Sequence, residues 1–76
     1  MIVVKLYGLL RLNSGIKELQ LDASSLKELL KQLETRGFSE RELAACNLLV
    51  NGTLAAKRST LKDGDTVQLF PPVAGG

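Results

Sequence analysis

The residues of this chain best placed to do chemistry stand at its carboxyl end. The last six residues carry no charged or long side chain: Pro71, Pro72, Val73, Ala74, Gly75 and Gly76. Proline fixes φ near −65° and glycine has no Cβ, so such a segment leaves its domain stiffly and stays thin to its end. Six extended residues reach roughly 20 Å. The pattern predicts a flexible tail over residues 71–76 that carries a terminal carboxylate into a partner's active site.

Side chains suited to catalysis are scarce elsewhere. The sequence has no histidine, the usual general acid or base near neutral pH and the commonest metal ligand. The one cysteine, Cys46, lies in an apolar run, and we expect it to be a small buried core residue. A single cysteine also excludes an intrachain disulfide, which fits a reducing compartment. We therefore expect no catalytic triad and no metal site, so function must come from a surface or a terminus.

Length and composition limit the class of protein further. A chain of 76 residues with 45% hydrophobic and 24% charged residues is typical of one folded domain. The net charge of +2 is spread along the chain without a basic stripe, so we expect no nucleic-acid partner. The apolar runs are far shorter than the roughly 20 residues that a membrane-spanning helix needs. These observations predict a cytoplasmic protein without a membrane partner.

The amino-terminal third predicts a β-hairpin. Apolar and β-branched residues over 2–10 are typical of a strand, with Tyr7 and Arg11 on its non-core parity. Asn13, Ser14 and Gly15 supply turn chemistry. Residues 17–21 then alternate polar and apolar side chains, as a second strand does.

One amphipathic helix follows the predicted hairpin. Ser25 stands three residues before Glu28, which is the spacing of a capping box. The residues expected to face the core at helical spacing are Leu26, Leu29, Leu30 and Leu33. Gly37 marks the end of this helix. A short second helical turn is expected after Ser39, with Glu42 three residues further on.

The remaining segments predict strands separated by tight turns. Residues 47–51 indicate a third strand that ends in an Asn51-Gly52 turn, and residues 62–65 form a turn before a last strand over 66–70. This order of elements favours an α+β, ubiquitin-like β-grasp, with a mixed sheet of four to five strands and one main helix packed on one face. Its first and last strands lie parallel in the middle. The domain covers residues 1–70, and the tail covers 71–76.

Several motifs resemble the MoaD family, the small sulfur-carrier subunits of molybdopterin synthase within the ubiquitin-like MoaD/ThiS superfamily. The resemblance spans the chain: Tyr7-Gly8 with Arg11, then residues 50–54 (Val-Asn-Gly-Thr-Leu), then residues 61–67. Its most specific part is the Pro-Pro-Val-Ala-Gly-Gly ending. The thiazole-pathway carrier ThiS shares the fold and the two glycines but usually lacks the double proline.

The resemblance implies a function for the terminal carboxylate. A partner resembling ubiquitin-activating enzymes (MoeB-like) would adenylate Gly76 with MgATP, and a persulfide donor would convert the adenylate to a thiocarboxylate. The tail would then enter the large subunit of molybdopterin synthase (MoaE-like) and give its sulfur to the pyranopterin precursor. The chain itself would bind no cofactor and supply no catalytic side chain.

Docking to these partners requires a shared surface near the tail. Tyr7, Leu54 and Phe70 are nominated for partner contact, since family members use apolar residues at the matching positions. Arg11 is expected to share the parity of Tyr7 and to pair with a partner carboxylate.

Three alternatives remain open on the sequence. A thiazole-pathway carrier would use the same chemistry on another acceptor. A ubiquitin-like modifier would join Gly76 to substrate lysines. A plain β-grasp interaction module would not need Gly75 and Gly76.

Overall fold

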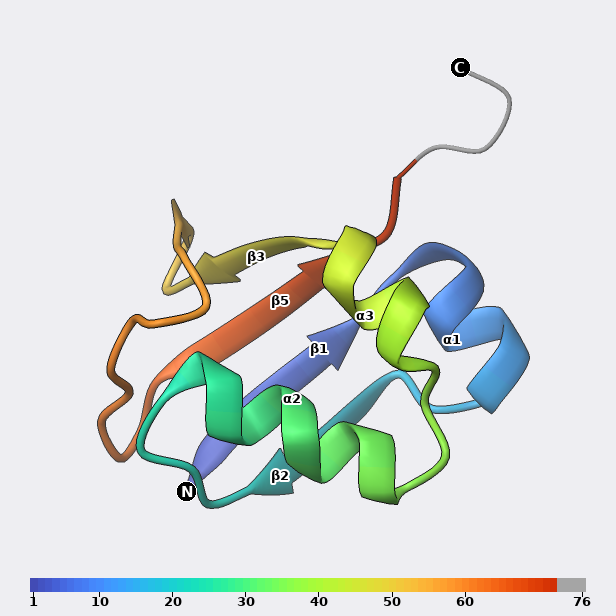
Figure 1. Ribbon diagram of the computed structural model, residues 1–76. Helices are drawn as coiled ribbons and strands as arrows, with labels where there is room; N and C mark the ends of the chain where they lie inside the picture. Colours follow the sequence, from blue (N-terminus) through green and yellow to red (C-terminus); the bar gives the residue numbers. More distant parts are fainter. Residues whose placement is uncertain (73–76) are drawn as a thin grey trace.

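The computed structural model describes residues 1–72 as a β-grasp, an α+β fold of one five-stranded mixed sheet with a main helix, as the sequence predicted (Figure 1). The elements in chain order are β1 (Ile2–Leu6), α1 (Gly8–Ser14), β2 (Glu18–Leu21), α2 (Leu26–Thr35), α3 (Glu40–Ala45), β3 (Asn47–Val50), β4 (Thr53–Leu54) and β5 (Thr66–Phe70).

The first and last strands form the middle of the sheet. The strand order is β2-β1-β5-β3-β4, and β1 runs parallel to β5 with Val4 opposite Val67 and Leu6 opposite Leu69. The β1–β2, β5–β3 and β3–β4 pairs are antiparallel. The predicted central parallel pair is confirmed, and it brings the carboxyl ends of β1 and β5 to one edge of the sheet.

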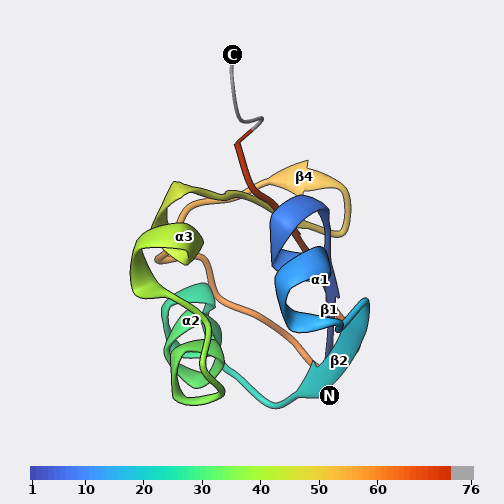
Figure 2. The same cartoon turned by 90° about the vertical axis from the view of Figure 1, so that its right-hand side faces the viewer.

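The core lies between the sheet and the helices on one of its faces. Alternate residues of β1, namely Ile2, Val4 and Leu6, are buried, as strand periodicity requires. The helix α2 buries all four predicted leucines, and Leu43 of α3 joins the same cluster. Figure 2 shows α2 and α3 on one side of the sheet, with α1 at the end of β1.

The predicted start of α2 at Ser25 is confirmed, but the predicted capping box forms only in part. The backbone N–H of Glu28 donates to Ser25 Oγ at 3.2 Å, so Ser25 caps the helix. The Glu28 carboxylate reaches one residue further back, where it accepts from the Ser24 hydroxyl at 2.6 Å and from the Ser24 N–H at 3.2 Å. These bonds hold the pKa of Glu28 below its ordinary value. The short helix α3 is confirmed as well, with the Glu42 N–H donating to Ser39 Oγ.

The predicted strand over residues 2–10 is wrong beyond Leu6, because residues 8–14 form α1. Gly8 adopts φ +58, a left-handed conformation that ends the extended strand. The helix ends at Gly15, whose N–H donates to the Arg11 carbonyl at 2.9 Å. The predicted hairpin is therefore half right: β1 and β2 do pair antiparallel, but a helix joins them in place of a tight turn.

Two connections near β5 are tied together by side chains. The Asn51-Gly52 turn is confirmed, with φ of 51 and 84. Asp65 accepts from the Lys62 N–H at 2.8 Å and from Asn51 Nδ2 at 2.9 Å, which lowers the pKa of its carboxyl. Asn51 Oδ1 in turn accepts from the Thr66 N–H at 3.0 Å. The β3–β4 turn is thereby fixed to the beginning of β5.

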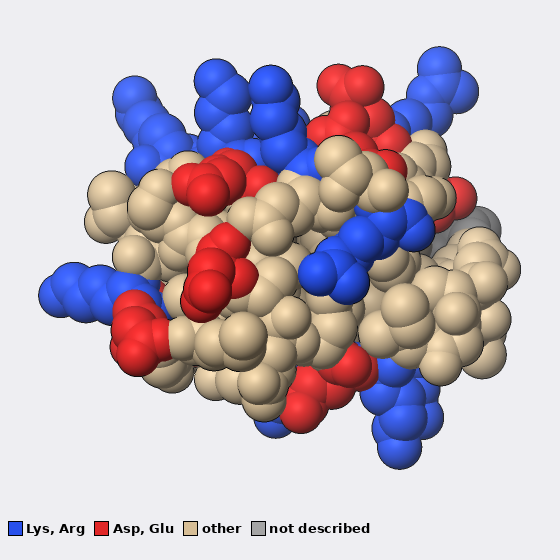
Figure 3. Space-filling view, turned by 90° about the horizontal axis from the view of Figure 1, so that it is seen from below, with Lys and Arg blue, Asp and Glu red and all other residues tan. Residues whose placement is uncertain are grey.

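Among residues 1–72, no helix has the length and apolar character needed to cross a membrane. On the underside of the molecule, Lys and Arg are interleaved with Asp and Glu (Figure 3). No block of a single charge dominates that face.

The helix α1 contributes one buried leucine to the core, and this can be tested. Leu10 is 2% exposed, whereas Leu12 in the same helix is 75% exposed. Leu10→Ala should lower the free energy of unfolding by about 2–5 kcal/mol, because it leaves a cavity. The matched control Leu12→Ala should stay within about 0.5 kcal/mol of the wild type in urea denaturation. Equal losses for the two variants would contradict the placement of α1.

Candidate functional site

The carboxyl ends of β1 and β5 hold a stacked aromatic pair. The rings of Tyr7 and Phe70 lie 4.3 Å apart between centroids, with 10° between their planes. The Tyr7 hydroxyl accepts from Gln68 Nε2 at 2.9 Å, which fixes the tyrosine against β5. Both aromatic residues are half-buried. The structure therefore brings together two of the residues nominated for partner contact, directly before Pro71.

Leu54 lies on the same outer face of the sheet. Cross-strand partners point to the same face, and the register pairs Leu54 with Leu49 and Leu49 with Gln68. Gln68 and Phe70 are two residues apart on β5, so they share that face as well. Leu54 is 71% exposed on the edge strand β4. It is on the predicted face, but β3 separates it from the Tyr7–Phe70 pair.

Two leucines of α1 enlarge the apolar surface beside the tail. Leu9 and Leu12 are 52% and 75% exposed. They line one shallow hollow together with Gly8, the aromatic pair and the two prolines. We call the side chains of this hollow the tail-base surface: Tyr7, Leu9, Leu12, Phe70, Pro71 and Pro72. Sequence reasoning missed both leucines as contact residues. The signal was their spacing of three residues, which puts them on one side of a helix but on opposite faces of a strand.

Arg11 does not occupy the position predicted for it. It was expected on the strand parity of Tyr7, but it belongs to α1 and its side chain is exposed there. The physical reason is the chain reversal at Gly8, after which strand alternation no longer governs the direction of side chains. Its role as a partner of an acidic group stays a prediction.

The tail itself is described only at its root. Pro71 is half-buried and Pro72 is exposed, and both follow β5 outside any helix or strand. Val73, Ala74, Gly75 and Gly76 lie outside the described residues. Their predicted roles, and the division into a domain and a tail, stay predictions.

Cys46 follows α3 at the edge of the core. The thiol donates to the Glu42 carbonyl at 3.2 Å and packs against the core cluster, but it is half-buried where we expected full burial. Burial first, and the nearby Glu42 carboxylate second, raise the pKa of this thiol. A thiol with a raised pKa is a poor nucleophile at neutral pH. Among residues 1–72, no group of three or more histidine, cysteine or acidic residues could hold a metal ion.

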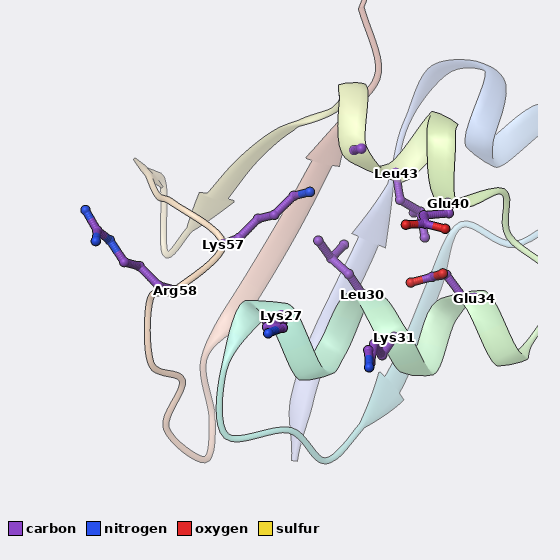
Figure 4. A pocket seen from close by; sticks show the side chains of 9 residues that line it. Lys27, Leu30, Lys31, Glu34, Glu40, Leu43, Lys57 and Arg58 are labelled. Atoms are coloured by element: carbon purple, nitrogen blue, oxygen red, sulfur yellow. The ribbon is translucent and has the colours of Figure 1, made fainter.

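A second groove lies between α2, α3 and the loop after β4 (Figure 4). Its floor includes Leu30 and Leu43. Side chains of both signs surround it: Lys27, Lys31, Lys57, Arg58, Glu34 and Glu40. None of its residues belongs to the tail-base surface. Because cations and carboxylates both border the groove, it presents no uniform charge to an anion.

The β-grasp fold, with an apolar surface around Pro71 and Pro72, is that of a small ubiquitin-like protein, and the comparisons place it in the MoaD/ThiS superfamily, the class of sulfur carriers and protein modifiers. The chain belongs to the ThiS family, whose model matches residues 4–76. No curated protein matches the chain.

Solved structures from three organisms are similar to the chain over its whole length. A chain of the complex of subunits 1 and 2 of molybdopterin-converting factor from Helicobacter pylori is 30% identical, with a TM-score of 0.75 and coverage of 99% of this chain and 97% of that one. SAMP1 from Haloferax volcanii is 29% identical, with a TM-score of 0.80 and coverage of 99% of this chain and 98% of that one. A chain of the BexX/CysO complex from Amycolatopsis orientalis is 27% identical, with a TM-score of 0.78 and full coverage of both chains.

The raised pKa of Cys46 predicts slow alkylation in the folded protein. At neutral pH the Cys46 thiol should react with iodoacetamide more slowly in the folded protein than in urea. In the folded protein a smaller fraction of the thiol is ionised to thiolate, and the side chain is half-buried. The measurement is the alkylation rate by mass spectrometry at several pH values. A folded-state rate above the urea rate would reveal an activated cysteine and contradict the assignment.

Proposed function

We propose that this protein is the sulfur carrier for molybdenum cofactor biosynthesis, acting as the small subunit of a molybdopterin synthase. The observation that carries the proposal is the apolar tail-base surface, which lies directly before the Val-Ala-Gly-Gly ending. A docking surface at the root of a thin tail lets a partner hold the domain while it receives the terminal carboxylate. The similarity to molybdopterin-converting factor and the double proline support the choice of pathway.

The carboxylate carbon of Gly76 is a poor electrophile, so it must be activated before sulfur can attack it. The Gly76 carboxylate attacks the α-phosphorus of ATP, pyrophosphate leaves, and an acyl adenylate forms. A persulfide sulfur then attacks the acyl carbon and displaces AMP, and a second thiol cleaves the resulting S–S bond to leave the Gly76 thiocarboxylate. That sulfur attacks an electrophilic carbon of the pyranopterin precursor in the large subunit and displaces an oxygen leaving group from it. Water then cleaves the bond between the Gly76 acyl carbon and the sulfur, which returns the Gly76 carboxylate and leaves the sulfur on the precursor as a thiolate.

Partner proteins would carry out every reaction step, and this chain would deliver the tail. The adenylating enzyme would bind ATP and Mg²⁺, a donor enzyme would carry the persulfide, and a MoaE-like large subunit would supply the bases. In this account the chain binds no cofactor, which agrees with its lack of histidine. Relatives solved as complexes with a second protein support the need for such partners. The adenylating enzyme and the large subunit would use the tail-base surface in turn.

Intact mass tests the proposal. After incubation with ATP, the adenylating enzyme of the same organism and a sulfur donor, the mass should rise by the difference between one sulfur and one oxygen. The matched control lacks Gly76 and should show no gain, because the reacting carboxylate is displaced by one residue. The modified protein should then convert the precursor when the large subunit is added. An unchanged mass for the full-length chain with active partners would refute the carrier role.

A protein modifier is the second candidate. The similarity to SAMP1, at a TM-score of 0.80, favours it, because a structure of the same name from Methanosarcina acetivorans is described as a small archaeal modifier protein. A modifier would form isopeptide bonds between Gly76 and substrate lysines, so Gly76-dependent conjugates in lysate would support it. A thiazole-pathway carrier would gain the same mass but would not bind the large subunit of molybdopterin synthase.

A further inference from the structure

Gly8 touches the root of the tail. It is the first residue of α1 and adopts φ +58. A Cβ at this position would lie 2.8 Å from Pro71 Cγ and 3.5 Å from Pro71 Cδ. Carbon atoms in ordinary contact stay about 3.5–4.0 Å apart, so any side chain here would force the proline ring away. The absence of a Cβ at Gly8 is what allows Pro71 to lie against α1.

Pro71 can give way to a side chain at position 8 in only two ways, by a change of ring pucker or by a shift of the main chain. Its ring closes on the backbone nitrogen, so apart from a change of pucker the ring moves only when the main chain moves. The preceding Phe70 is held by β5 and by the Tyr7 stack, and a residue before proline is confined to extended conformations. Leu10 of α1 and Ala45 of α3 border the hollow on the other side of the two prolines. The two prolines thus lie between α1, which approaches the Pro71 ring at Gly8, and an open hollow beside α3, into which a side chain at position 8 would push them.

We propose that Gly8 is a positioning residue that fixes the direction in which the tail leaves the domain. The inference rests on the proposed function, since the tail must deliver Gly76 to a reacting partner. Contact with Gly8 sets the path of Pro71, and the fixed φ of Pro72 extends that direction. A partner docked on the tail-base surface then receives the tail at one angle, so less freedom is lost when the carboxylate enters its active site.

A second glycine of the same helix provides the matched control. Gly15 ends α1 with φ +73, and a Cβ there would meet no atom within 4 Å. Alanine at either position therefore suffers similar left-handed strain, but only alanine at position 8 meets Pro71. In Figure 2, α1 lies below the point where the chain leaves β5.

The experiment compares Gly8→Ala with Gly15→Ala in the full-length chain. The first readout is the specificity constant kcat/KM of the adenylating enzyme for each variant. We expect Gly8→Ala to lose on the order of tenfold, as misplacement of a reacting group does, and Gly15→Ala to stay near the wild type. The second readout is the one-bond Cα–Hα residual dipolar coupling of Pro72 in the free protein, which reports the direction of the main chain after Pro71 and should change in Gly8→Ala alone. Equal kcat/KM values for the two variants would overturn the inference.

The Pro71→Ala variant separates the effect of the contact between position 8 and the Pro71 ring from the effect of backbone strain at position 8. It removes the ring that meets position 8, so we expect it to lose a similar factor by itself, and Gly8→Ala should add little in that background. Independent, multiplying losses would overturn the proposal. If Gly8→Ala does not fold, Pro71→Ala decides the matter, because an unchanged kcat/KM in that variant rules out a role for the contact.

Failure of the proposed function would look different. If the wild-type chain is never adenylated by an active enzyme, the carrier role fails, and the residual dipolar coupling of Pro72 alone decides whether Gly8 sets the tail direction. If the wild type reacts and the two glycine variants react equally, the carrier role stands and the positioning role fails.

Discussion

The parallel pairing of β1 with β5 is the constraint on which the candidate site depends. Parallel strands end at the same edge of a sheet, so the residue after β1 and the last residue of β5 become neighbours although 63 positions separate them in the sequence. The Tyr7–Phe70 stack and the Tyr7–Gln68 hydrogen bond are consequences of this pairing. So is the contact between Gly8 and Pro71. An antiparallel pair would have put the tail at the opposite end of β1.

The helix α1 completes the site by turning the chain at that edge. It buries Leu10 in the core, and it exposes Leu9 and Leu12 beside the prolines. Exposed leucines are common singly, but here they adjoin two half-buried aromatic rings and the base of a tail. In the proposed function the apolar surface and the terminal residues act together, whereas the charged groove of α2 and α3 is built from other residues.

The sequence was informative where its periodicity was unambiguous. The leucines of α2 recur only at helical spacing, and the Ser25–Glu28 and Asn51-Gly52 motifs each have a local mechanism, so the predicted elements are confirmed there. The segment after Leu6 was misread because Leu6 and Leu10 are four residues apart, which satisfies both a strand and a helix. Arg11 was misplaced for that reason. No local pattern could reveal the contact of Gly8 with Pro71, because it depends on the pairing of distant strands.

The affinity of the Phe70→Asp variant for the adenylating enzyme tests the central claim, that one apolar surface at the root of the tail presents Gly76 to its partners. The matched control is Thr66→Asp, with the same charge on the same strand and outer face but at the far end of β5. The account predicts that Kd rises more than about tenfold for Phe70→Asp, as loss of an interface anchor does, and little for Thr66→Asp. An unchanged Kd for a folded Phe70→Asp protein would contradict it.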